Sequence, residues 1–407
     1  MLDAANLFFL IVDTVSVFTI TSILLWTLYH IPIVTAGITS KKRQANVKTP
    51  SNPPRLTVII PVKDEPQKLK RCLESLSDTD YPREKLEIIV VDGSADSSCE
   101  AVVREFTSKN HQTINFIREE KPKGKPAALN AALRLATGDI VAVFDADSVP
   151  DKHVFTRAAS LFEDPSVVAV QGRTEPLNSS SLVSRTASKE EHIWHSAILQ
   201  GRQALNLFVP LTGSCQFIRR DMLLKLGGWS EDVLAEDLEL SLKLFETGYK
   251  VIYLPTAVSK QEVPSTLKGL IVQRSRWYRG YMEATLKHFK QILARSWRGL
   301  DALVLTSGPF LMVLSFIAIM MWFLTLLFPH NNNFTTQATL VLLLNAASIV
   351  TLGLALAFAD KPARLRNLAW IPFIYIYWFT LTAVATLSLL EIIARRPRVW
   401  RKTPKED

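Results

Sequence analysis

The sequence predicts an open, mostly parallel α/β sheet attached to an α-helical membrane region. Two observations support this fold class. Short apolar runs alternate with helical patterns through the charged interval 41–300. Longer apolar segments flank that interval, at residues 7–29, 302–328, 336–359 and 368–393. Each is longer than the roughly 20 residues that an α-helix needs to cross a bilayer.

The predicted sheet is built from short runs that are rich in β-branched residues. Such runs, with little polar alternation, are typical of parallel strands that are buried on both faces. We expect strands at residues 56–62, 86–92, 113–119, 139–147 and 167–176. Helical patterns between them cover residues 67–76, 97–106 and 126–136. This alternation predicts right-handed crossovers and a ligand site beyond the carboxyl ends of the strands.

Acidic residues gather at those strand ends. Glu65 follows the first strand, Asp92 ends the second, and Asp145 and Asp147 end the fourth. Side chains two residues apart on a strand point to the same face, so Asp145 and Asp147 are expected to converge. Neighbouring carboxylates repel each other unless a cation lies between them. The pair therefore predicts a Mg²⁺ or Mn²⁺ site, and the alternative is a polar strand end before a turn.

A lysine-rich segment, KPKGKPAALN at 121–130, precedes the third helical pattern. Pro126 fits the first turn of a helix, which places Lys123 and Lys125 at the positive end of the helix dipole. Anions are favoured at that position, so these lysines either contact a phosphate or are solvated loop residues. The sequence has no P-loop motif, which argues against a P-loop ATPase.

Two acids begin a later helical pattern. Glu236 and Asp237 stand in its first turn, and Leu238 and Leu242 belong to its apolar face. Acids in a first turn stabilise a helix through its dipole, with no further role required. A pair of acids beside a substrate edge also offers a general base.

A polar and aromatic face precedes the second apolar segment. Gln273, Arg276 and Trp277 are spaced i, i+3 and i+4, so they share one face of a helix. An amide, a guanidinium and a large ring suit a phosphate and the flat face of a sugar. An amphipathic helix at a membrane interface uses the same residue types, and both interpretations can hold together.

The flanking charges predict the membrane topology. The first apolar segment lacks a basic n-region and a cleavage-site pattern, so we expect a permanent anchor. Basic residues at 41–43 follow it, and the positive-inside rule then places the central domain in the cytoplasm. The basic tail at 394–402 would lie outside if 368–393 crosses once, unless that segment is broken at Pro372.

The composition limits the partners that can be expected. The formal net charge is +9, and much of the basic excess flanks the apolar segments, where membrane lipid headgroups account for it. No nucleic-acid-binding motif is present, so we expect no nucleic-acid partner. Three cysteines without metal-ligand spacing suit a reducing cytosol.

Taken together, these segments resemble a known family. The motifs IIPVKDEP, VVDGS, FDADS, AEDLEL and QRSRW occur in the order found in family-two glycosyltransferases of GT-A fold. The resemblance is to the membrane-embedded branch that includes cellulose, chitin, hyaluronan and poly-N-acetylglucosamine synthases. It covers about residues 55–300, with one anchor before and three spans after.

The resemblance implies roles for the acids and the lysine at the sheet edge. Asp92 would contact the base of a UDP-sugar, with Glu65 beside it. Asp145 and Asp147 would form the D-x-D that holds the metal and the nucleotide-sugar. Lys125 is similar to a lysine that the family places near the nucleotide diphosphate.

The later motifs would serve the acceptor. Asp237, with Glu236 before it, matches the E-D motif and would deprotonate the acceptor hydroxyl. Gln273, Arg276 and Trp277 match Q-x-x-R-W, which contacts the diphosphate and the acceptor end. The segment GSCQFIRR at 213–220 is similar to one that lines the acceptor site. The first strand departs from the family, since it ends in V-K-D-E where a Tyr-Asn-Glu sequence is common.

We therefore expect four regions: an anchor at 1–40, a Rossmann-like GT-A catalytic domain at 41–260, amphipathic interface helices at 261–300, and about three transmembrane helices with a basic tail at 301–407. The expected activity is inverting transfer of a sugar from a UDP-sugar to a growing polysaccharide, with a divalent cation. The expected location is the plasma membrane. Homo-oligomerisation, the donor sugar and the linkage stay open.

Three alternatives remain at this point. Ceramide glucosyltransferases are similar in these motifs and add a single sugar to a lipid. A channel or scaffold with a degenerate nucleotide-binding domain would have lost at least one of the acids, yet all are present. A polyprenyl-phosphate sugar transferase generally lacks Q-x-x-R-W, which this sequence has.

Overall fold

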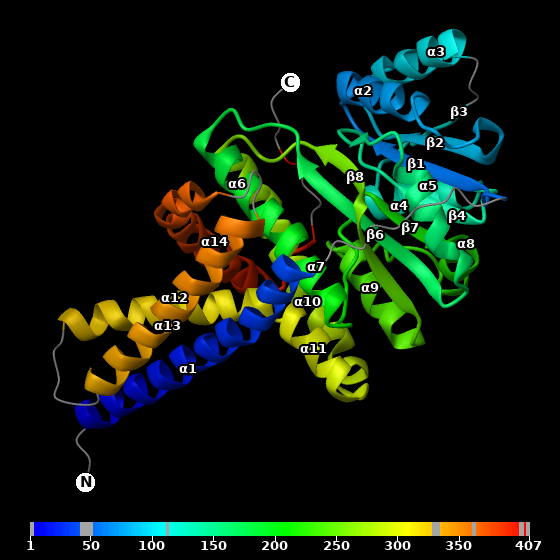
Figure 1. Cartoon of the computed structure of the whole chain (residues 1–407). Helices are drawn as coiled ribbons and strands as arrows, with labels where there is room; N and C mark the ends of the chain where they lie inside the picture. Colours follow the sequence, from blue (N-terminus) through cyan, green and yellow to red (C-terminus); the bar gives the residue numbers. More distant parts are fainter. Residues whose placement is uncertain are drawn as a thin grey trace.

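The computed structural model describes residues 4–40, 52–110, 114–327, 334–359 and 364–398, together with Thr403. A sheet domain forms one end of the molecule. Three long helices extend together away from it (Figure 1): α1 (Ala4–Thr39), α12 (Gly308–Leu327) and α13 (Phe334–Leu354).

The sheet domain contains strands β1 (Leu56–Val62), β2 (Leu86–Asp92), β3 (Ile114–Arg118), β4 (Ile140–Val143), β5 (Val149–Pro150), β6 (Val167–Pro176), β7 (Gln216–Arg219) and β8 (Lys250–Gln261). They form one sheet in the order β3–β2–β1–β4–β7–β6–β8–β5. Strands β3, β2, β1 and β4 are parallel to one another, as are β6 and β8. Strand β7 is antiparallel to both of its neighbours, and β5 is antiparallel to β8. The predicted mostly parallel α/β sheet is confirmed.

Alternate residues of β1 enter two different cores. Leu56, Val58 and Ile60 pack with α2 (Pro66–Ser77) and α3 (Ser98–Asn110) on one face of the sheet. Ile59 packs with α4 (Lys125–Leu133) and α9 (Glu236–Thr247) on the other. Each fully buried side chain of this size stabilises the fold by roughly 1.5–3 kcal/mol. Burial on both faces explains why the strand has no polar alternation.

The strand predicted at 139–147 is shorter than expected. Strand β4 ends at Val143, and a turn follows it in which the backbone N–H of Ser148 donates to the carbonyl oxygen of Asp145 at 3.0 Å. The hydroxyl of Ser214, which precedes β7, accepts the backbone N–H of Asp145 at 3.2 Å. These contacts replace ladder hydrogen bonds, so Asp145 and Asp147 lie in a turn and not on a strand.

One helical run, which the sequence did not reveal, joins the sheet domain to α1. Helix α6 (Leu182–Ile193) continues through a π-helical segment, η3 (Trp194–Leu199), into α7 (Gln200–Ala204). A Cβ added at Gly201 would lie 1.9 Å from the carbonyl oxygen of Ile33, so only glycine permits this close approach to α1.

A buried ion pair fixes the same junction. Arg202 of α7 donates to both carboxylate oxygens of Asp301 in α11 (Ser296–Thr306), at 2.8 and 2.7 Å. Tyr29 of α1 also donates to Asp301. Because both charges are fully or almost fully buried, removing either would leave the other unpaired at high cost.

Three helices of the described chain are long and apolar enough to cross a membrane: Leu7–Thr39, Thr339–Phe358 and Leu365–Ile393. The pair Trp297–Thr306 and Gly308–Met321 is bent by 54° and makes a fourth candidate if it acts as one span. Inside this bundle, Asp13 of α1 accepts a hydrogen bond from Gln337 of α13 at 2.8 Å.

The last helix, α14 (Ile371–Ile393), packs along α10 (Leu267–Leu293). Pro372 stands in its first turn, where proline suits a helix start, so it does not break the segment. Beyond α14, Arg279 of α10 donates to the carbonyl oxygen of Arg396 at 2.5 Å. Arg398 pairs with Glu283 of α10 at 2.8 Å. The described part of the tail therefore lies against α10.

Candidate active site

A single cavity of about 1620 Å³ extends from the carboxyl ends of the parallel strands to the long apolar helices. Its lining includes most of the site residues predicted from the sequence, namely Glu65, Lys125, Asp145, Asp147, Glu236, Asp237, Gln273, Arg276 and Trp277. Residues from β1, α4, α9 and α10 thus meet in one space, although they are widely separated in the sequence.

Lys125 links the two acidic motifs of the cavity. It is the first residue of α4, and its Nζ lies 2.6 Å from Oδ1 of Asp145 and 4.0 Å from Oε1 of Glu236. It also donates to the carbonyl oxygen of Gly213 at 2.9 Å. Burial alone would lower the pKa of Lys125, but the Asp145 and Glu236 carboxylates raise the pKa overall. Lys125 is therefore a fixed positive charge between the acids.

Gly213 allows the two motifs to approach each other. Its φ is +83°, a conformation that favours glycine. A Cβ added there would lie 3.2 Å from Oδ2 of Asp237 and 3.4 Å from Nζ of Lys125. Leu211, two residues earlier, donates its N–H to the hydroxyl of Ser241 on α9 at 2.8 Å. This loop therefore sets the distance between the D-x-D turn and the start of α9.

Asp237 lies in the first turn of α9, beside Glu236. Burial and the neighbouring Glu236 carboxylate raise the pKa of Asp237 to about 7, and Lys125 opposes this shift. A carboxyl group with a pKa near neutral pH can be deprotonated and still accept a proton from a substrate, as a general base requires.

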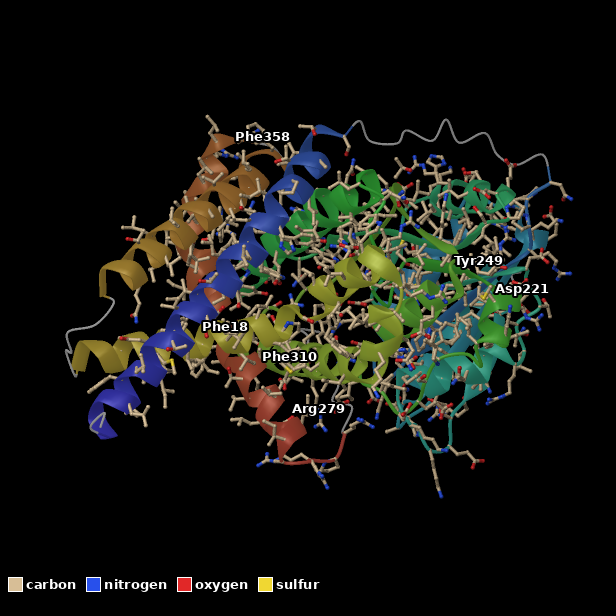
Figure 2. All side chains as sticks on the ribbon, turned by 90° about the horizontal axis from the view of Figure 1, so that it is seen from below. Phe18, Asp221, Tyr249, Arg279, Phe310 and Phe358 are labelled. Atoms are coloured by element: carbon tan, nitrogen blue, oxygen red, sulfur yellow. The ribbon has the colours of Figure 1, made fainter. Side chains whose placement is uncertain are left out.

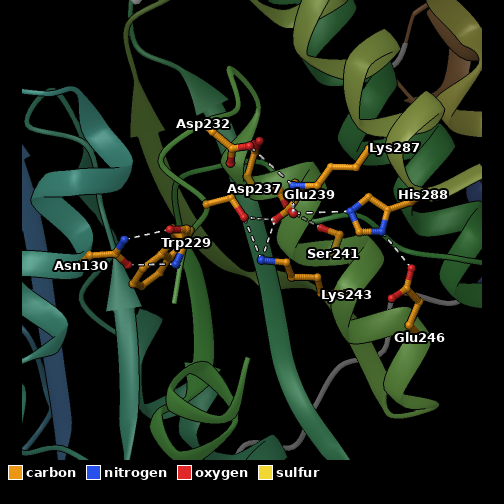
Figure 3. A network of polar contacts seen from close by, with 11 residues as sticks. Asn130, Trp229, Asp232, Asp237, Glu239, Ser241, Lys243, Glu246, Lys287 and His288 are labelled. Atoms are coloured by element: carbon orange, nitrogen blue, oxygen red, sulfur yellow. Dashed lines mark hydrogen bonds and ion pairs between the residues drawn. The ribbon is translucent and has the colours of Figure 1, made fainter. Parts of the chain in front are cut away.

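A network of charges behind Asp237 holds α9 in place (Figure 3). Glu239 is fully buried and accepts hydrogen bonds from Ser230, at 2.8 Å, and Lys287, at 3.1 Å, while Lys243 lies 3.1 Å away. Burial would raise the pKa of Glu239, but hydrogen bonds from His288 and Ser230 lower it overall to about 2. This fully paired network fixes the helix that carries Asp237.

The Q-x-x-R-W face of α10 also lines the cavity. Trp277 is 37 % exposed, and the guanidinium of Arg274 stacks on its ring at 4.1 Å from the centroid. The Arg274 guanidinium in turn pairs with Glu190 of α6. Arg274 was not among the residues predicted from the motif, because its partners come from elements that are distant in the sequence.

Glu65 lies after β1, immediately before α2, and Asp92 ends β2, but only Glu65 lines the cavity. Asp92 is fully buried, and its carboxylate accepts hydrogen bonds from the N–H of Ser94 at 2.8 Å and from Arg118 at 3.0 Å. Asp92 therefore does not line the cavity itself, although the next residue, Gly93, does.

The two carboxylates of the D-x-D turn differ in exposure and in partners. The Asp145 side chain is 37 % exposed, whereas Asp147 is buried and accepts the N–H of Glu262 at 3.2 Å. Among the described residues, no group of three or more His, Cys, Asp or Glu side chains could hold a metal ion. Cations that bridge phosphates need only one or two protein carboxylates, since substrate oxygens and water complete the shell. The two aspartates fit an ion of that kind.

Comparisons with known proteins give relatives for most of the sheet domain. Residues 53–280 match the family described as glycosyltransferase like family 2. The probable glycosyltransferase YdaM of Bacillus subtilis (strain 168) is 32% identical over 243 residues, which are 58% of this chain and 58% of that protein. The poly-beta-1,6-N-acetyl-D-glucosamine synthase of Staphylococcus aureus (strain COL) is 28% identical over 236 residues, 58% of this chain and 56% of that protein. The chain thus matches little more than half the length of these relatives.

One solved structure resembles nearly the whole chain. The mannosyltransferase PcManGT from Pyrobaculum calidifontis, in complex with GDP-Man and Mn²⁺, superposes with a TM-score of 0.67 over 95% of this chain and 99% of that one. At 21% identity this likeness concerns the fold. The family match covers more than half of the sequence. The chain therefore belongs to glycosyltransferase family 2 and has a GT-A fold.

Proposed function

We propose that this glycosyltransferase moves a sugar from a UDP-sugar to a growing polysaccharide at the membrane, with inversion at the anomeric carbon. The observation that carries this proposal is the position of Lys125, which holds the D-x-D turn and the E-D pair within one cavity. A donor diphosphate near Asp145 and Lys125 would then place its sugar close to Asp237.

The reaction is a single displacement. The acceptor oxygen forms a bond to the anomeric carbon as the bond from that carbon to the diphosphate oxygen breaks, and Asp237 takes the acceptor proton. Lys125 and Arg276 offset the charge that develops on the departing UDP. Positioning and fixed electrostatics supply most of the rate in such a site.

Asp145 and Asp147 would hold a Mg²⁺ or Mn²⁺ ion together with the donor diphosphate. The ion would neutralise negative charge on the diphosphate. The residues Glu65 and Asp92 would support the nucleotide base. Asp92 would act indirectly through Ser94 and Arg118, because its own side chain is fully buried.

The catalytic domain is proposed to face the cytoplasm of a cell whose plasma membrane holds the long helices. The poly-beta-1,6-N-acetyl-D-glucosamine synthase similarity supports a polysaccharide product. The structurally similar mannosyltransferase binds GDP-Man, so a GDP-sugar is the donor to be compared with UDP-sugars in the assay.

A second candidate is transfer of one sugar to a membrane lipid. The part of the cavity between the long helices is lined by apolar side chains such as Ile20, Ile23, Leu342 and Phe379. Such a wall suits an acyl or isoprenoid chain better than a polar glucan. Product size separates the two candidates.

The test uses the full-length protein in nanodiscs with radiolabelled UDP-sugars, GDP-mannose and either Mg²⁺ or Mn²⁺. A ladder or a high-molecular-weight product from one UDP-sugar is the expected result. A single lipid-extractable product would establish the second candidate. Turnover of GDP-mannose alone would overturn the proposed donor class.

A further inference from the structure

A cluster of polar side chains on the cavity wall has no part in the donor chemistry described above. Glu190 and Glu191 come from α6, His195 from the π-helical segment η3, Thr174 from β6 and Arg274 from α10. All of them line the cavity. The convergence of polar residues from several elements on one cavity wall indicates a binding site.

The members of this cluster fix one another. The hydroxyl of Thr174 lies 2.7 Å from Nε2 of His195 and donates to Glu191. Nε2 of His195 is 3.3 Å from the Glu191 carboxylate. Burial would raise the pKa of Glu191, but hydrogen bonds from His195 and Thr174 lower it overall. Glu191 is therefore an ionised carboxylate that faces the cavity.

Other polar atoms of the same wall have no partner. Three buried atoms make no hydrogen bond: Nδ1 of His195, Nε of Arg274 and Oε1 of Gln273. Water cannot easily serve as their partner, because His195 is only 1% exposed and Arg274 only 5%. Unsatisfied buried polar atoms are uncommon in folded proteins and require an explanation. They form a set of donors and acceptors that a ligand with hydroxyl groups would satisfy.

The π-helical segment is a second sign of function. Helix α6 changes to π geometry at Trp194, which lines the cavity, and returns to α geometry at Gln200. π-Helical turns are rare and occur frequently at functional sites. Here the wider turn carries Trp194 and His195, and both line the cavity.

The cluster lies beside the long helices, because the π-helical segment that carries His195 packs against α1. Tyr281 lines the cavity one turn beyond Trp277 on α10. Burial raises the pKa of Tyr281, the Asp237 carboxylate raises it further, and the Arg274 guanidinium opposes this shift. Arg274 also donates a hydrogen bond to the hydroxyl of Tyr377 in α14, at 3.2 Å.

The charges of the cluster discriminate between acceptors. Glu190 and Glu191 together outweigh the one fixed cation, Arg274, which is already paired with Glu190. An anionic lipid phosphate would meet repulsion from these carboxylates. A neutral sugar would donate hydroxyl hydrogen bonds to them, and Trp277 offers a flat ring beside the same wall.

We propose that Glu190, Glu191, His195 and Arg274 form the subsite for a neutral, hydroxyl-rich acceptor sugar, in the same cavity as Asp237. This inference rests on the proposed glycosyl transfer and names its acceptor class. Arg274 supports the ring of Trp277 and offers its Nε to the acceptor, and Glu191 and His195 contact the acceptor directly.

The experiment measures UDP release by the full-length protein in nanodiscs, since maltoside detergents carry sugar headgroups. Hydrolysis of the donor without acceptor reports the donor site. Chitobiose, cellobiose and farnesyl phosphate are then added in separate titrations. The variants are Glu191→Gln and His195→Asn, and His192→Asn is the matched control on the same helical run, outside the cavity lining.

At least one disaccharide is expected to stimulate UDP release. Its half-saturating concentration should rise at least tenfold in Glu191→Gln and in His195→Asn, with donor hydrolysis within twofold of the unmodified protein and of His192→Asn. Unchanged half-saturation in both variants would overturn the subsite. Stimulation by farnesyl phosphate alone would also overturn it.

Failure of the proposed function would look different. In that case the unmodified protein would release no UDP from any donor, with or without acceptor. Saturation-transfer NMR of the same disaccharides then tests the subsite alone. Sugar signals that are present for the unmodified protein and lost in Glu191→Gln support it, and their absence from the unmodified protein contradicts it.

Discussion

The Nζ atom of Lys125 lies 2.6 Å from Oδ1 of Asp145, and this contact joins the start of α4 to the D-x-D turn. The same ammonium group is 4.0 Å from Glu236, the residue before the proposed base. Two acidic motifs that are far apart in the sequence therefore share one cation. The charge of Lys125 is expected to act on both donor binding and the ionisation of Asp237.

Replacing Lys125 by glutamine should lower turnover by about 100-fold or more, because one preorganised charge near the leaving group is lost. The pH profile should change as well. Asp237 must be deprotonated to act as a base, so kcat/KM falls as the pH drops below its pKa of about 7. Lys125 lowers that pKa, and Lys125→Gln should therefore move the acidic limb to higher pH.

Measurement of UDP release between pH 5 and 9 checks this expectation. Lys121→Gln is the matched control, since Lys121 is exposed and lies outside the cavity lining. An acidic limb at the same pH in Lys125→Gln and in the unmodified protein would show that the two groups do not interact.

Asp147→Asn should weaken the metal-dependent part of UDP binding. The substitution removes a negative charge while keeping the shape of the side chain, and the Glu262 N–H can still donate to the remaining amide oxygen. We expect the Mn²⁺ concentration that gives half-maximal UDP binding to rise several-fold. Calorimetric titrations with and without Mn²⁺ measure it, and an unchanged metal dependence would rule out Asp147 as a ligand.

Glu239→Gln should destabilise the protein without touching the cavity. Glu239 is fully buried, and its carboxylate is shared by Lys243, Lys287 and His288. Breaking a buried charge network by removing one partner costs about 3–5 kcal/mol. Thermal unfolding of the purified protein should show a clearly lower Tm than for Glu163→Gln, an exposed control. Equal Tm values would show that the network contributes little to stability.

The basic tail should lie on the same side of the membrane as the sheet domain. Arg396 and Arg398 contact α10, which belongs to the cavity wall. Cysteines introduced as Arg398→Cys and Lys152→Cys should then react with an impermeant maleimide in vesicles of the same orientation. Labelling from opposite sides would mean that α14 crosses the bilayer and that its contacts with α10 differ in the membrane.

The sequence predicted the parallel half of the sheet well, because burial on both faces leaves a clear signature. Strands β1 and β2 match the expected ranges to the residue. Strand β4 does not, since the prediction extended it to Asp147. The turn that replaces it depends on Ser214, which comes from another part of the chain. No local pattern around residues 144–147 reveals that partner.

The candidate site was predictable where a motif is local. The E-D pair and the Q-x-x-R-W residues line the same cavity. For Gln273, Arg276 and Trp277, the i, i+3 and i+4 spacing predicted a shared helical face. The polar cluster around α6 was not predicted from the sequence. Glu191 and His195 form a site only through their contacts with Thr174, which comes from β6. The π-helical segment that presents His195 also has no recognised sequence pattern.

The most direct test of the proposed chemistry is Asp237→Asn, assayed in parallel for UDP binding and for sugar transfer. The substitution removes the base but keeps the size and the hydrogen-bonding shape of the side chain. We expect UDP affinity within about twofold of the unmodified protein, with transfer lowered by about 100-fold or more. Retained transfer, or loss of UDP binding together with transfer, would contradict the role of Asp237 as the base that deprotonates the acceptor.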